Sequence, residues 1–325
     1  MSREFRPSFG LRPAHLQTIL ASVGPRRSDV RKRSAAVVRA SQDVILDCGD
    51  GVRLLAHHTM HGDQQRDLVV LLHGWEGSGE SQYLLSAAAH LYASGYDIVR
   101  LNLRDHGPTH QLNQDLFHSC RIDEVVGAIA AINKLFPHDR LLFLGYSLGG
   151  NFGLRLALKA PSHGITLDAV AAICPVLDPA HTMRQLEART FVYRQYFVYK
   201  WARSLRRKAA AWPAHFDFSD ILSKPTLKSM THALVERFTH YANMPEYLNG
   251  YAVVDGVLAD LQVPTLIIAT EDDPIIPIAD LARLARPATL VIDQQRYGGH
   301  CGFLEGLSGP SWADQRVEDW FSSLR

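Results

Sequence analysis

Short, continuously apolar runs alternate along the chain with longer segments whose apolar residues recur at helical spacing. Continuous apolar runs are typical of strands buried on both faces. The predicted strands are Leu68–Leu72, Asp97–Leu103, Leu141–Leu144, Ala169–Cys174, Pro264–Thr270 and Thr289–Asp293. The predicted helices are Ser81–Ser94, Ile122–Leu135, a run that ends near Lys159, and Trp312–Leu324. This alternation predicts an α/β fold, with a mostly parallel central sheet and helices on both faces.

An antiparallel pair is expected before this alternating part. The extended segments Gln42–Asp47 and Val52–Met60 flank a turn of sequence Cys48-Gly49-Asp50-Gly51. Strand-like runs on both sides of a Gly- and Asp-containing turn predict a β-hairpin.

One long stretch, from about residue 180 to residue 262, contains no strand pattern. It holds an aromatic run at residues 191–201, and a group of basic residues follows: Arg203, Arg206, Arg207 and Lys208. We predict a helical cap inserted between two strands of the sheet. Its aromatic side chains have two interpretations, which are packing between cap and core or a lid over an apolar substrate pocket.

Residues 1–35 form a basic N-terminal arm ahead of the main domain, which we place at residues 36–325. A nucleic-acid-binding arm is one interpretation of its arginines. No interleaved aromatic residues or recognisable binding fold accompany them, which favours a solvated extension.

Charge and cysteine usage restrict the partners of the protein. The chain has 34 Lys+Arg against 33 Asp+Glu, so no global field draws it to nucleic acid or anionic lipid. Its four cysteines are scattered, which fits a reducing compartment. No apolar run reaches the 18 residues of a membrane span. We therefore expect a cytoplasmic protein that has neither a nucleic-acid partner nor an integral membrane segment; its oligomeric state stays open.

The strongest chemical signal is Gly145-Tyr146-Ser147-Leu148-Gly149, which matches the pattern G-x-S-x-G. A predicted strand leads into this motif and a predicted helix leads out of it, as a nucleophile elbow requires. The turn places the serine hydroxyl at the end of the sheet, beside the positive end of the following helix. Ser147 is therefore the candidate nucleophile.

A serine nucleophile needs a base, and the base needs an acid that orients it. His300 is the candidate base because the loop that holds it, residues 297–303, follows the last predicted strand. The acid is expected between serine and histidine in the chain. Asp273 is preferred because Pro274 fixes the turn after it, and Asp272 is the alternative.

Acyl transfer also needs N–H donors for the oxyanion that develops. The backbone N–H of Leu148, directly after the nucleophile, is one candidate. The second is the N–H of Trp75 in the loop His73-Gly74-Trp75-Glu76-Gly77-Ser78; His73 itself is interpreted as a structural residue. The histidines form no metal-binding signature, and no dinucleotide-binding motif or P-loop is present, so we expect neither a metal nor a cofactor.

These motifs together resemble the α/β-hydrolase superfamily, and more closely its YheT-like branch. The resemblance is carried by Arg12-Pro13-Ala14-His15-Leu16-Gln17-Thr18-Ile19, by the His-Gly-x-Glu-Gly-Ser run at residues 73–78, by Asp272-Asp273-Pro274, and by Gly298-Gly299-His300-x-Gly302-Phe303. It spans residues 12 to about 303. It implies an α/β-hydrolase fold and a carboxylic ester hydrolase that uses a serine triad, an acyl-enzyme intermediate and no cofactor.

The resemblance also implies alternatives. Relatives of this branch include ABHD-type lipid hydrolases and alcohol acyltransferases that use the same triad, and a non-catalytic binding protein is a further alternative. Two departures lie near the expected site. Arg104-Asp105-His106-Gly107 stands where relatives often have Arg-Gly-Cys-x-Gly, and Trp75 replaces a common Leu. Short- to medium-chain or lipid-like esters are therefore all expected as substrates, without a preferred chain length. The residues of the 15–18 segment indicate no chemical role by themselves, and a packing role for the N-terminal arm is one interpretation.

Overall fold

The computed structural model describes residues 4–62, 64–189 and 191–325, so the first three residues of the expected arm and residue 190 of the expected cap lie outside it. Its centre is an eight-stranded sheet with the order β1-β2-β4-β3-β5-β6-β7-β8. The strands are β1 (Gln42–Asp47), β2 (Arg53–Thr59), β3 (Leu68–Leu72), β4 (Asp97–Leu101), β5 (Leu141–Tyr146), β6 (Ala169–Ile173), β7 (Thr265–Thr270) and β8 (Leu290–Gln295). The pairs β1–β2 and β2–β4 are antiparallel and the other pairs are parallel. This confirms the predicted hairpin and the mostly parallel sheet.

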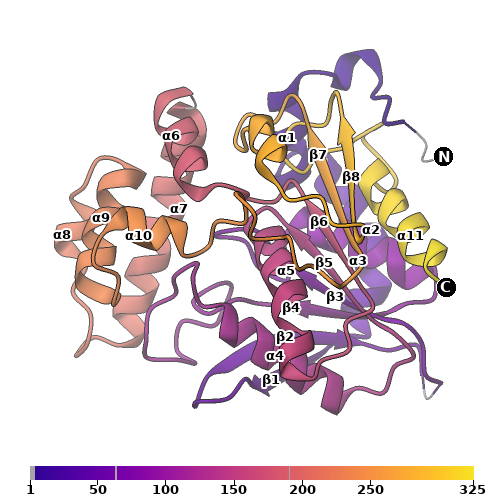
Figure 1. Ribbon diagram of the computed structural model, residues 1–325, viewed down its shortest axis with the longest axis horizontal. Helices are drawn as coiled ribbons and strands as arrows, with labels where there is room; N and C mark the ends of the chain where they lie inside the picture. The colour runs from indigo at the N-terminus through magenta and orange to yellow at the C-terminus, as the bar shows by residue number, and fades with distance from the viewer. Residues whose placement is uncertain (1–3, 63, 190) are drawn as a thin grey trace.

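Helices cover both faces of the sheet (Figure 1). Alternate residues of β3 divide between the two sides, as the pleat of a strand requires. Val69 and Leu71 pack with the helices α3 (Gln82–Ala93) and α11 (Trp312–Ser323). Val70 and Leu72 pack with the helices α4 (Ile122–Leu135) and α5 (Leu148–Lys159). The continuous apolar runs seen in the sequence are therefore strands buried on both sides.

Five helices occupy the chain between β6 and β7 and form the cap, at the left of Figure 1. They are α6 (Pro179–Arg189), α7 (Phe191–Ala211), α8 (Ser219–Leu222), α9 (Leu227–Phe238) and α10 (Met244–Asn249). Three short 3₁₀ helices complete the described chain: Phe9–Leu11, Pro161–His163 and Ile278–Arg283. No described helix combines the length and the apolar composition needed to cross a membrane.

The N-terminal segment differs from the solvated arm that we expected. It forms the helices α1 (Ala14–Ser22) and α2 (Arg26–Arg39), and α2 packs along α3. Val30 and Val37, seven residues apart, are each 1% exposed and lie on one face of α2. Arg26 is also buried and donates to Ser86 Oγ at 3.1 Å. The segment was not recognised as an amphipathic helix because arginines dominate its sequence, although its apolar residues are spaced to lie on one face.

Val37→Ala tests whether α2 is part of the folded domain. Removing two buried methyl groups should lower the free energy of unfolding by about 2 kcal/mol. Val38→Ala is the matched control, because Val38 is 39% exposed and its replacement should change stability by less than about 0.5 kcal/mol. Equal effects of both variants in thermal or urea unfolding would contradict the packing of α2.

Candidate active site

Ser147 lies in a tight turn between β5 and α5. Its backbone is in the left-handed region, with φ 54° and ψ −117°, a conformation that is unfavourable for a residue with a Cβ. Its N–H donates to Ile173 O at 2.8 Å, which ties the turn to the end of β6. The helix α5 begins at the next residue, so the serine sits at the positive end of a helix.

Two glycines permit this turn because neighbouring backbones approach too closely for a side chain. A Cβ on Gly145 would lie 2.2 Å from Gly149 O, and a Cβ on Gly149 would lie 2.4 Å from Leu72 O. The first turn of α5 is therefore pressed against the ends of β3 and β5. The glycines of the G-x-S-x-G pattern are required by packing as well as by the turn.

The two predicted oxyanion donors belong to residues that line the same cavity as this serine. The N–H of Leu148 is in the first turn of α5, where no intrahelical acceptor exists. Trp75 follows Gly74, and a Cβ on that glycine would lie 3.1 Å from Ser147 Cβ. Among the hydrogen bonds of the described residues, none uses the N–H of Trp75 or of Leu148. Both donors are therefore available to a ligand at Ser147.

His300 and Asp273 lie in hydrogen-bond contact. Nδ1 of His300 is 2.8 Å from Asp273 Oδ2. The other carboxylate oxygen, Oδ1, accepts from the N–H groups of Ile275 and Ile276 at 2.8 and 2.9 Å. The Asp273 side chain is 3% exposed. An acceptor held in this way fixes the ring so that Nδ1 carries its hydrogen and Nε2 is free to accept a proton.

Asp272 contacts the histidine loop and not the ring. Its Oδ1 accepts from Gly299 N at 2.8 Å, while Thr270 Oγ1 donates to Gly299 O at 3.0 Å. The residue before His300 is therefore held through both its N–H and its carbonyl oxygen. The two aspartates thus have different positions: Asp273 lies against the imidazole, and Asp272 holds its backbone.

The pKa of His300 is shifted by two opposing effects. Burial lowers the pKa, whereas the adjacent Asp273 carboxylate, assisted by Cys301, raises it, and the net result is a pKa well above the ordinary value of 6.5. A neighbouring negative charge favours the imidazolium form. The protonated form of the His300 ring is therefore stabilised.

The N-terminal helix α1 reaches this loop. Thr18 Oγ1 accepts from His300 N at 2.9 Å and donates to Ala14 O at 2.8 Å. Gln17, which is fully buried, donates to Leu304 O at 2.9 Å and accepts from Leu304 N at 2.7 Å. The residue 15–18 segment, for which the sequence indicated no chemical role, therefore anchors the loop that carries His300.

His73 has a structural position, in agreement with its interpretation from the sequence. It is completely buried, with Nδ1 2.8 Å from Gly74 O and Nε2 accepting from Leu103 N at 3.2 Å. Burial, and then the proximity of His106, lower its pKa well below the ordinary value, so the ring is neutral. It joins the loops that follow β3 and β4.

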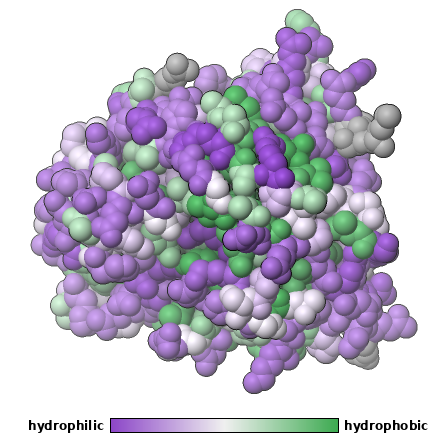
Figure 2. Space-filling model, viewed as in Figure 1, coloured by the Kyte–Doolittle hydropathy of each residue, from purple (hydrophilic) through white to green (hydrophobic). Residues whose placement is uncertain are grey.

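A cavity of about 670 Å³ opens beside the serine. Ser147, Leu148, Trp75 and His300 all contribute to its wall, although no hydrogen bond between described residues joins Ser147 to the His300 ring. The cap forms the opposite wall. Figure 2 shows hydrophobic residues gathered in the middle of one face, where the cap meets the rest of the molecule.

Two aromatic residues of α7 pack against the core and also line the cavity. Phe197 stacks on Trp75 with ring centroids 5.4 Å apart, and Trp201 meets the same indole edge-on at 5.3 Å. Both also line the cavity. They therefore pack the cap onto the core and at the same time border the space above Ser147.

A buried ion pair fastens α7 to the core. Lys208 is completely buried, and its Nζ donates to Asp105 Oδ1 at 2.8 Å and to the carbonyl oxygens of Asn113 and Asp115 at 2.6 and 3.0 Å. Three acceptors satisfy the three hydrogens of an ammonium group. This contact fixes the cap helix over the segment after β4, where the sequence departs from its relatives.

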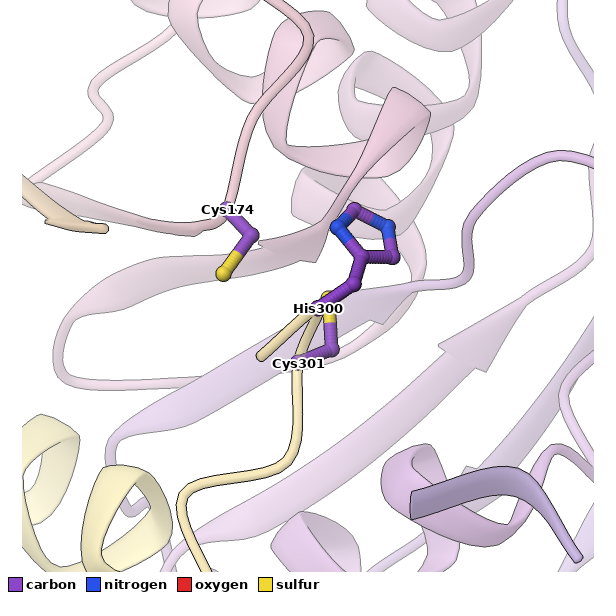
Figure 3. A group of neighbouring side chains, drawn as sticks. All are labelled: Cys174, His300 and Cys301. Atoms are coloured by element: carbon purple, nitrogen blue, oxygen red, sulfur yellow. The ribbon is translucent and has the colours of Figure 1, made fainter. Parts of the chain in front are cut away.

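A compact group of potential metal ligands includes the His300 ring (Figure 3). Its members are Cys174, His300 and Cys301. One donor atom of each lies within 4.8 Å of the others, and all four cysteines of the chain are free thiols. Thiolate and imidazole are ligands that Zn²⁺ prefers. A metal ion here would have to take Nε2 of His300 or displace Asp273 from Nδ1. Either arrangement would prevent the ring from acting as a base held by Asp273.

Comparison with known proteins decides the family. The model of the alpha/beta hydrolase fold family matches residues 67–307. The chain belongs to this family. The sequence-based prediction of an α/β-hydrolase fold is thereby confirmed.

Individual relatives of this α/β-hydrolase agree with that assignment. YheT of Escherichia coli (strain K12), whose name describes it as a candidate esterase, is 26% identical over 331 aligned residues, covering 99% of this chain and 94% of YheT. Monoacylglycerol lipase ABHD2 of Danio rerio is 21% identical and covers 95% of this chain and 75% of its own length. The predicted relation to the YheT-like branch and to the hydrolase class of enzymes is confirmed.

Solved structures agree in fold. The esterase Pf2001 of Pyrococcus furiosus superposes with a TM-score of 0.60, at 14% identity, over 87% of this chain and 91% of its own. At this level of identity the superposition shows the common fold alone.

The ionisation of His300 can be measured directly. In Asp273→Asn the pKa of His300, followed by NMR titration, should fall below its wild-type value, because burial then acts without the opposing carboxylate. Asp272→Asn is the matched control; it keeps an oxygen acceptor for Gly299 and should change the pKa much less. A larger shift in Asp272→Asn would contradict the arrangement described.

The anchoring of the histidine loop by α1 is also testable. Thr18→Val leaves the N–H of His300 without its acceptor, at a cost of about 1–3 kcal/mol. Hydrogen exchange of the His300 amide should accelerate by roughly 10-fold or more, whereas Thr18→Ser, which keeps the oxygen, should exchange close to wild type. Unchanged exchange in Thr18→Val would show that the loop does not depend on this contact.

Proposed function

We propose that this α/β-hydrolase cleaves carboxylic esters through a triad of Ser147, His300 and Asp273. The observation that carries the proposal is the Asp273–His300 hydrogen bond beside a cavity whose wall also contains Ser147. The names of two relatives, an esterase and a monoacylglycerol lipase, support ester substrates. The size of the cavity is compatible with short- to medium-chain or lipid-like esters.

The reaction proceeds in two acyl-transfer steps. Ser147 Oγ attacks the ester carbonyl while Nε2 of His300 takes its proton. Asp273 stabilises the imidazolium that forms and keeps the ring in place. The N–H groups of Trp75 and Leu148 donate to the oxyanion, and His300 then protonates the departing alcohol. Water, activated by His300, hydrolyses the acyl-enzyme and releases the acid.

The local structure suits each of these roles. The strained backbone of Ser147 projects the hydroxyl away from the end of the sheet, and the positive end of α5 favours the negative charge that develops. Because His300 must be neutral to accept a proton, its raised pKa places the rising limb of the pH–rate profile above the ordinary pKa of 6.5.

Hydrolysis of p-nitrophenyl esters from acetate to palmitate tests this function. Ser147→Ala should lower the turnover number by roughly 10⁴-fold or more, because no other group supplies the nucleophile. Ser162→Ala, which changes an exposed serine of the 3₁₀ helix Pro161–His163, is the matched control and should keep wild-type turnover.

Two outcomes would change the proposal. Near-wild-type turnover by folded Ser147→Ala would overturn the serine mechanism. An ester product that forms when ethanol is added, in place of free acid, would show that an alcohol replaces water as the acceptor and that the protein is an acyltransferase.

A further inference from the structure

Three basic side chains of α7 lie along the cavity that contains Ser147. Lys200, Arg203 and Arg207 are spaced by three and four residues, so they share one face of the helix. All three line the cavity, whereas Arg206, between them in sequence, does not. We call these three residues the basic stripe.

The basic stripe has no carboxylate partner among the ion pairs of the described residues. Other basic residues on the same helix do: Lys208 pairs with Asp105 and Arg194 pairs with Glu187. Like charges three and four residues apart on a helix repel one another. Burial lowers the pKa of Lys200, so part of this charge is held away from water. The pocket thus brings three positive charges close together, and a bound anion would reduce their mutual repulsion.

The acidic residues of the cavity wall do not neutralise the basic stripe. Burial raises the pKa of Glu76 to about 8 although Lys200 opposes this shift, so the carboxyl group is mostly protonated near pH 7. Asp105 is engaged by Lys208, and Glu80 by Arg100. Arg27 of α2 adds a further positive charge to the same wall. The polar side of the pocket is therefore cationic at neutral pH.

Another part of the cavity wall is apolar. It comes from the cap helices α6, α9 and α10 and from the ends of β6 and β7, and its members include Val176, Leu186, Leu227, Leu234, Tyr251 and Ile275. A pocket with one cationic side and one apolar side is complementary to an amphiphile that carries a negative charge.

We propose that the substrate is an anionic amphiphilic ester, whose apolar part lies against the cap helices and whose carboxylate, phosphate or sulfate group is bound by Lys200, Arg203 and Arg207. This inference rests on the proposed ester hydrolysis at Ser147 and names the substrate class for it. The basic cluster that the sequence showed at residues 203–208 then divides in two: Arg203 and Arg207 face the substrate, and Lys208 anchors the cap.

A binding measurement tests the anion site without any turnover. Octyl sulfate and octanol share one chain, and neither is a carboxylic ester. By calorimetry at low salt, octyl sulfate should bind roughly 10-fold more tightly than octanol, since several partly exposed ion pairs contribute modestly each. The double variant Arg203→Gln/Arg207→Gln should remove this preference, and the control Arg206→Gln should keep it. Equal affinity for both compounds in the wild type, or a preference that survives in the double variant, would overturn the inference.

A kinetic measurement places the anion relative to the scissile bond. p-Nitrophenyl hexanoate is compared with the p-nitrophenyl monoester of adipic acid, and 1-naphthyl acetate with a sulfonated naphthyl acetate. We expect a higher kcat/KM for the charged member of at least one pair, by roughly 10-fold at low salt and much less at high salt because salt screens the charges. The double variant should lose the preference for the charged member, whereas Arg206→Gln should keep it. No preference in either pair would overturn the inference.

The two proposals can fail separately. Ser147-dependent hydrolysis of neutral esters with no preference for the charged ones would leave the proposed function standing and remove the anionic substrate. Binding of octyl sulfate through Arg203 and Arg207, together with no cleavage of any ester, would keep the anion site and overturn the proposed function.

Discussion

The close approach of α5 to the ends of β3 and β5 is the constraint on which the site depends. Gly145 and Gly149 allow backbone atoms to meet where a Cβ would overlap a carbonyl oxygen. This contact holds Ser147 in an unfavourable backbone conformation, and the residue lines the cavity. The residues Leu148 and Trp75 line the same cavity as this serine. A larger residue at Gly145 or Gly149 would push α5 away from the ends of β3 and β5. Ser147 and Leu148 would then move as well, because both depend on this packing contact.

The histidine loop depends on segments from distant parts of the chain. Asp272 and Thr270, at the end of β7, hold the N–H and the carbonyl oxygen of Gly299, and Thr18 of α1 accepts from His300 N. Asp273 therefore meets a ring whose backbone is already fixed. These fixed hydrogen bonds limit the conformations of the loop that carries His300, so the ring is held close to one geometry. The N-terminal helices are therefore in contact with the rest of the fold, α1 at the histidine loop and α2 along α3.

The helix α7 combines support and recognition. Lys208 and Trp201 attach it to the core, through a buried ion pair and through aromatic contact with Trp75. The turns around these contacts present Lys200, Arg203 and Arg207 to the cavity. A helix anchored in this way holds charged side chains near one another despite their repulsion, because the cost is small beside the buried contacts. The basic side chains of the pocket therefore come from the cap, whereas the residues of the proposed triad follow strands of the sheet.

The alternation of strands and helices, the helical insertion and the turn at Ser147 could all be predicted from the sequence, because they follow from local periodicity and from short motifs. The sequence also brought Asp273 and His300 forward as candidates, through their positions after strands that end at one edge of the sheet. Three features came from the tertiary structure: which aspartate contacts the His300 ring, what Gln17 and Thr18 contact, and how α2 packs. Each of these depends on side chains that meet across large separations in sequence, about 280 residues for Thr18 and His300. Local sequence patterns do not predict such contacts. They indicate which face of a helix or strand is apolar, but not which other element that face packs against.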